Sequence, residues 1–318
     1  MRLDDSVLSN TERIIFTLRA LYQSCGYERY RMRRFEEYEL YSRNKDFLVS
    51  DQVIVFTDTN GKLMALKPDV TLSIIKNSRD NPDSVRKLCY NESVYRVSER
   101  GGTFHEIMQA GVECFGRIEE KELAEVLCLA GETLALLGKN AVLVLSDLDI
   151  LHCFLDEIGL LPEEKQKLLR CVGEKNLHEI KSICDTWNVP AEKTERLKKL
   201  LSLYGESEKV LPELEKLCAG TAAGETLNQM KTLISRLKER RGTVRTEIDF
   251  SLVSDGNYYN GIVFKGYLEG VPERVLSGGR YDRLMEKMGK KAKAIGFAVY
   301  LDALERIALP EKSIEVSD

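Results

Sequence analysis

The chain has 318 residues, of which 43% are apolar and 31% are charged, and its formal net charge is −4 with acids and bases interspersed. This length holds one large domain or two moderate ones, and the apolar content is enough for a full core. The slightly negative balance gives no basic face of the kind that indicates a nucleic-acid binder. Composition therefore indicates an ordinary globular protein.

Eight cysteines occur singly rather than in close pairs, and most lie inside apolar runs. This spacing is typical of buried, reduced thiols and disfavours a disulfide framework or a zinc site. The sequence shows no signal peptide and no apolar run of the length that spans a bilayer. We therefore expect a cytoplasmic protein with no metal, no cofactor and no membrane contact.

The first predicted element is an amphipathic helix over residues 9–26, where apolar side chains recur at helical spacing. Ser9, Asn10 and Thr11 are candidate N-caps, and Gly26 is a candidate stop. The next runs, 53–58 and 63–68, flank an Asn-Gly pair at 60–61, which is a strong hairpin signal. Further β-like runs follow up to residue 116. Residues 1–145 therefore predict an antiparallel sheet with packing helices.

Residues 147–241 are rich in Leu, Glu and Lys with helical periodicity and short breaks, which predicts several short helices. From residue 244 the β pattern resumes, and a helix is expected near residues 281–288. We therefore expect an α+β protein whose core comprises residues 1–146 and 243–318. Residues 147–242 would form a helical insertion within that core.

The segment 94–113 reads as a strand, a polar loop and a returning strand. Gln109 and Glu113 are four residues apart, so they share one face of the second strand. A buried amide and carboxylate require polar partners. Arg96 on the first strand could neutralise Glu113 in a purely structural network, and ion pairs of that kind are commoner than functional sites.

Two adjacent tyrosines, Tyr258 and Tyr259, follow a polar loop and precede an apolar run. In an extended strand their side chains would point to opposite faces, so one is expected to pack and the other to face a cavity. Two further segments complete the candidate site: LKPDVT at 66–71 and SGGRYDRL at 277–284. The Gly-Gly pair at 278–279 would let backbone approach a pocket closely.

Taken together and in this order, the four segments resemble the core of class II aminoacyl-tRNA synthetases, specifically histidyl-tRNA synthetase. The resemblance implies an antiparallel sheet flanked by helices, with an amino-acid site on it. Tyr259 would then contact a histidine imidazole, with Tyr258 packed beside it, while Asp69, Thr71 and Glu113 would accept hydrogen bonds from the ammonium. Carried over by position, the histidine-binding residues are Asp69, Thr71, Arg96, Gln109, Glu113, Tyr258, Tyr259 and Tyr281.

The sequence departs from the synthetase pattern where cations would act on ATP. Ser254 and Ala303 stand where the family has arginines, and Thr103 and His105 occupy arginine positions in the loop after Arg96. Adenylate formation builds negative charge at a phosphate, and fixed cations supply much of its stabilisation. The proline of motif 1 and an anticodon-binding domain of about 100 residues are also missing. We therefore expect no catalytic residues and no tRNA partner.

A retained amino-acid pocket without these functions resembles the regulatory subunits of ATP phosphoribosyltransferase, which are paralogues of histidyl-tRNA synthetase. The resemblance implies a non-catalytic subunit that activates a short catalytic subunit in the first step of histidine biosynthesis and takes part in feedback by L-histidine. It also implies a homodimer within a hetero-oligomer. Two alternatives remain: a reduced synthetase-like enzyme that uses Arg96, Arg100 and Arg306, or a free-standing histidine sensor with another partner.

Overall fold

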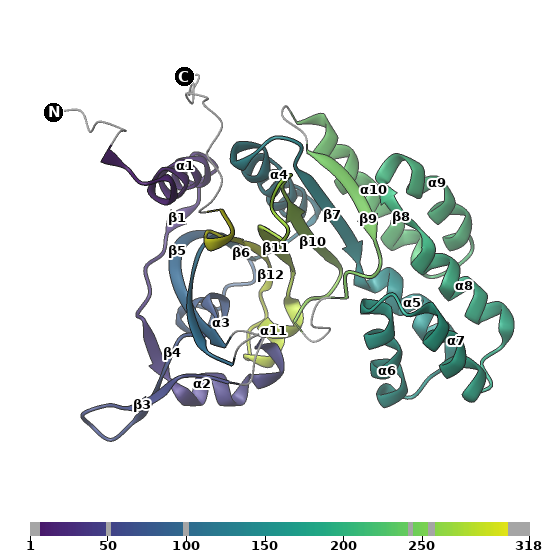
Figure 1. Ribbon diagram of the computed structural model, residues 1–318, viewed down its shortest axis with the longest axis horizontal. Helices are drawn as coiled ribbons and strands as arrows, with labels where there is room; N and C mark the ends of the chain where they lie inside the picture. Colours follow the sequence, from purple (N-terminus) through teal and green to yellow (C-terminus); the bar gives the residue numbers. More distant parts are fainter. Residues whose placement is uncertain (1–6, 49–51, 98–101, 241–243, 254–257, 305–318) are drawn as a thin grey trace.

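The computed structural model describes residues 7–48, 52–97, 102–240, 244–253 and 258–304. A large, strongly twisted sheet forms the centre of the molecule, and a group of helices extends from one side of it (Figure 1). No helix among the described residues has the length and apolarity needed to cross a membrane.

The large sheet has nine strands, and two of its strand pairs are parallel while the rest are antiparallel. The expected α+β class is confirmed, with the correction that the sheet is mixed rather than wholly antiparallel. In spatial order its strands are β1 (Glu28–Arg29), β5 (Val85–Val97), β6 (Phe104–Gly116), β12 (Lys293–Tyr300), β11 (Leu276–Arg280), β10 (Ile262–Tyr267), β7 (Val142–Asp147), β9 (Arg245–Asp249) and β8 (Tyr204–Glu206).

The two faces of this sheet carry different layers. Helices α1 (Asn10–Ser24) and α4 (Glu120–Leu137) cover one face, where Ala110, Val112 and Cys114 of β6 join the main hydrophobic core. Because strand side chains alternate, Gln109 and Glu113 point to the other face. That face is covered in part by two shorter helices, α3 (Val70–Asn77) and α11 (Asp282–Lys287), which pack in a second core.

Local sequence signals account for several of these elements. Helix α1 begins at the N-cap Ser9, whose side chain accepts from Glu12 N while the Glu12 carboxylate accepts from the Ser9 backbone. This reciprocal pair satisfies amide groups that the first helical turn leaves without partners. The predicted hairpin at Asn60-Gly61 is also present, with Gly61 at a φ of +81°. Its strands β3 (Val55–Thr57) and β4 (Leu63–Leu66) join β2 (Phe35–Glu37) in a separate three-stranded sheet beside α2 (Tyr38–Arg43).

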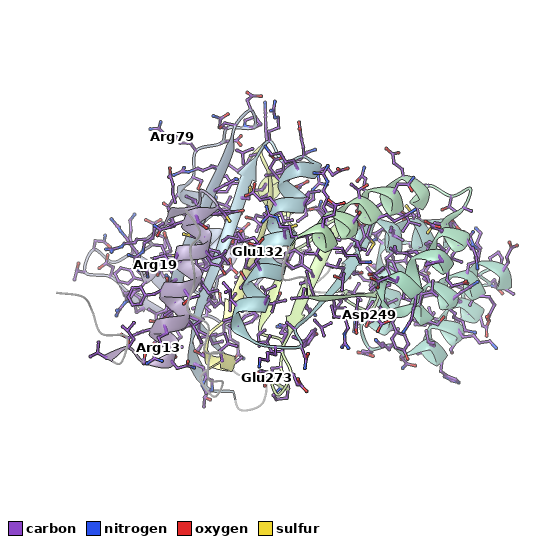
Figure 2. All side chains as sticks on the ribbon, turned by 90° about the horizontal axis from the view of Figure 1, so that it is seen from above. Arg13, Arg19, Arg79, Glu132, Asp249 and Glu273 are labelled. Atoms are coloured by element: carbon purple, nitrogen blue, oxygen red, sulfur yellow. The ribbon has the colours of Figure 1, made fainter. Side chains whose placement is uncertain are left out.

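A block of helices lies between β7 and β9, as the sequence predicts. Helix α10 (Ala223–Glu239) packs on α4. Two ion pairs join these helices, one between Arg236 and Glu120 and one between Arg240 and Glu132 (Glu132 is labelled in Figure 2). The segment is not wholly helical, because β8 adds a strand to the edge of the large sheet beside β9. The helices of this block are α5 (Leu148–Ile158), α6 (Pro162–Gly173), α7 (Leu177–Thr186), α8 (Ala191–Ser202), α9 (Ser207–Cys218) and α10 (Ala223–Glu239).

Candidate functional site

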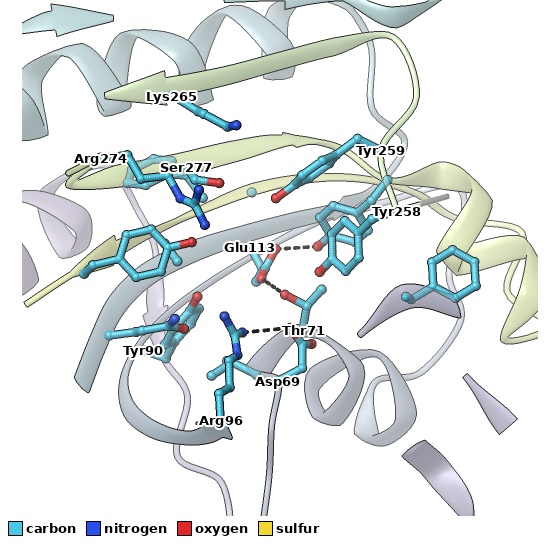
Figure 3. A pocket seen from close by; sticks show the side chains of 18 of the residues that line it. Asp69, Thr71, Tyr90, Arg96, Glu113, Tyr258, Tyr259, Lys265, Arg274 and Ser277 are labelled. Atoms are coloured by element: carbon cyan, nitrogen blue, oxygen red, sulfur yellow. Dashed lines mark hydrogen bonds and ion pairs between the residues drawn. The ribbon is translucent and has the colours of Figure 1, made fainter. Parts of the chain in front are cut away.

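A cavity of about 240 Å³ lies between the start of α3 and the face of the large sheet opposite α1 and α4 (Figure 3). Residues that are far apart in the sequence converge on it from α3, β5, β6 and the segments that flank β10 and β11. Every residue expected at the site lines this cavity: Asp69, Thr71, Arg96, Gln109, Glu113, Tyr258, Tyr259 and Tyr281.

Glu113 of β6 lines the cavity and is 2% exposed. Its carboxylate accepts hydrogen bonds from the hydroxyls of Thr71, at 2.6 Å, and Tyr281, at 2.5 Å. Burial raises the pKa of Glu113 to about 8, because these two hydroxyls only partly replace the lost hydration. At neutral pH the empty site therefore holds Glu113 mainly as the neutral acid.

Asp69 has two structural partners. Its side chain caps α3 by accepting from the amide of Leu72 at 2.8 Å, and it pairs with Arg96 at 3.7 Å. Arg96 also donates from Nε to the carbonyl of Pro68 at 2.7 Å. The expected neutralisation of Glu113 by Arg96 is therefore wrong: the ion pair of Arg96 is with Asp69, since β5 delivers the arginine to the N-terminus of α3 rather than to β6.

Both adjacent tyrosines line the cavity, so the expectation that they face opposite ways is wrong. They precede β10 rather than lying inside it, and the turn there releases them from strand alternation. Their ring centroids are 4.6 Å apart, and the Tyr258 ring also lies 6.0 Å from that of Tyr281 and 6.4 Å from that of Phe47. Burial raises the pKa of all three tyrosine hydroxyls, which therefore remain neutral hydrogen-bond donors.

Two glycines make room for these side chains. A Cβ at Gly296 would lie 2.0 Å from Oε2 of Glu113, and a Cβ at Gly279 would lie 2.7 Å from the Tyr259 ring. Both positions directly face the cavity residues across the sheet, because Gly296 pairs with Glu113 and with Gly279 in register. Of the Gly-Gly pair at 278–279, Gly279 therefore serves close packing at the site, whereas Gly278 faces the main core, where a Cβ would meet Phe264 and Phe297.

Four polar residues that also line the cavity were not expected from the sequence: Lys265, Arg274, Ser277 and Tyr300. Lys265 of β10 is in register with Ser277 of β11, so both side chains occupy the same sheet face. Strand alternation places Val263 and Lys265 on one face, and this signal was available in the sequence. The guanidinium of Arg274, which comes from the loop before β11, lies over the Tyr300 ring at 5.6 Å.

The positions where cations were missing from the sequence pattern divide into two groups. Thr103 and His105 contact each other at 3.1 Å and do not line the cavity, and Ala303 packs against the main core. Ser254 lies outside the described residues, and so do Arg100 and Arg306, the arginines that the synthetase-like alternative would use. No group of His, Cys, Asp and Glu side chains suited to a metal ion occurs in the described part of the chain.

Comparisons with known proteins agree with the geometry. The family model of histidyl-tRNA synthetase matches residues 3–304. A regulatory subunit of ATP phosphoribosyltransferase from Acetivibrio thermocellus is 26% identical, over 94% of this chain and 72% of the relative. A protein of the same name from Bacillus cereus is 28% identical, over 93% of this chain and 71% of the relative.

Solved structures show the same fold. A Bacillus halodurans structure described as an ATP phosphoribosyltransferase regulatory subunit/histidyl-tRNA synthetase has a TM-score of 0.82 and 27% identity, over 95% of this chain and 79% of that one. A chain of the ATP phosphoribosyltransferase complex from Thermotoga maritima has a TM-score of 0.71 at 21% identity, over 92% of this chain and 97% of that one, which shows the fold alone. The chain belongs to the histidyl-tRNA synthetase family and, within it, to the regulatory subunits of ATP phosphoribosyltransferase.

Proposed function

We propose that this regulatory subunit binds free L-histidine in the cavity and conveys its occupancy to a short catalytic subunit of ATP phosphoribosyltransferase. The observation that carries the proposal is the convergence of two carboxylates and three tyrosines on one cavity of about 240 Å³. That volume lies below the roughly 300–1,000 Å³ of pockets for drug-sized ligands, so it suits a single amino acid.

We assign the imidazole of the ligand to Glu113, in place of the ammonium that the family resemblance assigned to this residue. The three tyrosine rings gather on that side of the cavity, where they offer an apolar, aromatic surface with hydroxyls at its edge. An imidazole and an acid of raised pKa can share one proton in a charge-assisted hydrogen bond. Tyr259 supplies a second polar contact from its hydroxyl.

The ammonium group fits best at Asp69. Burial raises the pKa of Asp69, and the nearby Arg96 partly offsets this effect, while a bound ammonium would favour the carboxylate further. Because each of the two acids then faces one donor end of histidine, an amino acid without a donor side chain would leave Glu113 with only the hydroxyls of Thr71 and Tyr281 as partners. Sites built in this way reject ligands that lack the donor.

Family membership supports a proposal for the partner and for the assembly state. Relatives of this chain are named for their part in ATP phosphoribosyltransferase, and one neighbour in fold was solved as a chain of that complex. We propose that the chain forms a homodimer that joins short catalytic subunits in a closed, symmetric hetero-oligomer. We place this complex in the cytoplasm, where the eight unpaired cysteines stay reduced.

Reconstitution with a short catalytic subunit tests the proposal. Transferase activity should rise when this chain is added, and L-histidine should suppress that rise. The synthetase-like alternative predicts instead that the chain alone exchanges pyrophosphate into ATP when histidine is present. The free-sensor alternative predicts histidine binding without any association with the catalytic subunit. Either of those two results would refute the proposed role.

A further inference from the structure

The proposed pose leaves the α-carboxylate of the ligand without a partner. Glu113 is assigned to the imidazole and Asp69 to the ammonium. Arg96, the cation next to Asp69, is already engaged by Asp69 at 3.7 Å and by the carbonyl of Pro68 at 2.7 Å. A carboxylate taken out of water needs a cation or several hydrogen-bond donors. Gln109 lines the cavity and offers an amide donor, which a cation must supplement if a carboxylate is to be held out of water.

Lys265 and Arg274 provide cations at the opposite end of the cavity from Glu113. Lys265 lies on β10 and Glu113 on β6, which are separated by β11 and β12. Three strand spacings put the two backbones roughly 14 Å apart across the sheet. Both long side chains reach inward from this distance, and Figure 3 shows the ends of Lys265 and Arg274 directed toward the space above Glu113.

Small side chains keep this end of the cavity open. Ser277 and Ala298 lie in register with each other between Lys265 and β6, and both line the cavity. Tyr300 fixes the position of Arg274, since the guanidinium stacks over its ring. The acidic residues that line the cavity, Asp69 and Glu113, are on its other side. Lys265 and Arg274 therefore lie apart from both acids, whereas Arg96 is paired with Asp69 on the acidic side of the cavity.

We propose that Lys265 and Arg274 bind the free α-carboxylate of the amino acid and make the site selective for the free acid over its carboxyl-blocked forms. This inference rests on the proposed function and assigns two residues to it.

The test compares L-histidine with L-histidinamide, which keeps the imidazole and the amino group but has no negative charge. Binding of each is measured by calorimetry to the full chain and to the Lys265→Gln, Arg274→Gln and double variants. Lys231→Gln is the matched control, because Lys231 pairs with Glu215 on the surface of the helical block. Circular dichroism and urea midpoints establish that each variant is folded, and Arg274, in a surface loop, is the substitution with the least effect on packing.

We expect wild type to prefer the acid to the amide by at least about tenfold, as is typical when a charge pair is lost. Each single variant should lose about tenfold in affinity for histidine and keep its affinity for histidinamide, and the control should match wild type. Unchanged histidine affinity in the folded double variant overturns the inference alone. Equal binding of acid and amide by wild type does the same. If wild type binds no histidine, the proposed function fails and this inference fails with it.

Discussion

Glu113 is a buried acid whose direct partners are two hydroxyl groups rather than a cation. Its raised pKa, about 8, reflects an environment that disfavours the carboxylate until a ligand arrives. Without a ligand, the charged form of Glu113 therefore lowers the stability of the folded protein. Strain of this kind at one residue is common at functional sites, where the ligand supplies the missing interaction.

The first prediction concerns stability without ligand. Because the folded pKa of Glu113 is about 8 and that of an unfolded glutamate about 4.5, the folded state holds the proton longer. Stability contributed by this group is therefore present below pH 4.5 and is lost as pH rises through 8. Relative to Glu113→Gln, wild type should lose on the order of 3 kcal/mol between pH 5 and pH 9. Urea denaturation at both pH values measures this, and identical pH dependence in the two proteins would count against a buried, titrating Glu113.

The second prediction concerns the pH dependence of histidine binding. If imidazole and Glu113 share one proton, affinity should be highest between the imidazole pKa of about 6.5 and the Glu113 pKa of about 8. Below this window both groups are protonated, and above it both have lost the proton. Titrations from pH 5.5 to 9 should give a bell-shaped profile, and Glu113→Gln should lose its alkaline limb. If Glu113 held the ammonium instead, affinity would keep rising up to pH 8 and then level off.

The sequence was sufficient to predict which side chains line one cavity. It was not sufficient to predict which of them form hydrogen bonds and ion pairs with one another. Strand alternation was sufficient to put Gln109 and Glu113 on one face, and all eight expected residues line the cavity. The partner of Arg96 depends on where α3 begins relative to β5, and that geometry arises from tertiary packing. For the same reason, the orientation of Tyr258 could not follow from an assumed strand.

At the scale of elements, the site depends on how closely β12 approaches β6. Gly296 of β12 pairs with Glu113, and a methyl group there would lie 2.0 Å from the carboxylate and 2.5 Å from the carbonyl of Val112. The carbonyl belongs to the neighbouring strand and moves only if the sheet distorts. Gly296 therefore contributes to the site because it has no side chain that would occupy the position of the Glu113 carboxylate.

The third prediction is that Gly296→Ala destabilises the protein by about 1–3 kcal/mol, as overpacking typically does, and abolishes histidine binding at concentrations that saturate wild type. Gly224→Ala is the control, because a Cβ at Gly224 in α10 meets nothing closer than 3.7 Å. That variant should bind histidine normally. Thermal denaturation and calorimetry on both proteins provide the measurement, and wild-type histidine affinity in folded Gly296→Ala would contradict the packing argument.

Elements with local signals could be predicted, and those defined by distant pairing could not. The capping box of α1 and the Asn-Gly hairpin follow from a few neighbouring residues. In contrast, β1 has two residues and β8 has three, and each exists because a strand far away in the sequence pairs with it. The parallel pairs β1–β5 and β7–β9 require crossover connections, whose spatial outcome short-range periodicity does not encode.

At the scale of the whole molecule, the cavity lies in the centre of the nine-stranded sheet, while the helical block is attached at its β7–β9 side. The cavity is lined by β5 and β6 from the N-terminal half of the chain and by β10, β11 and β12 from its C-terminal part. The site therefore forms only when these two parts fold together. A ligand that binds there stabilises the whole sheet by mass action.

The fourth prediction concerns assembly and chemistry. The purified chain should be a dimer, should form a larger defined complex with the short catalytic subunit, and should show only background histidine-dependent exchange of pyrophosphate into ATP. The last expectation follows because each lost charge-assisted contact costs roughly 2.7–4 kcal/mol in a transition state. Light scattering of the chain alone and of the mixture, with an exchange assay, checks all three. A chain that stays monomeric in both samples would contradict the assembly.

Calorimetric titration of L-histidine into wild type and Glu113→Gln at pH 7 tests the central claim most directly, with Glu215→Gln on the surface of the helical block as the matched control. The substitution keeps the shape of Glu113 and removes the carboxylate that shares a proton with the ligand. Loss of one member of a desolvated pair costs about 2–5 kcal/mol, so we expect affinity to fall by well over tenfold in the folded variant and to be unchanged in the control. No histidine binding by wild type, or equal binding by Glu113→Gln, would contradict the account.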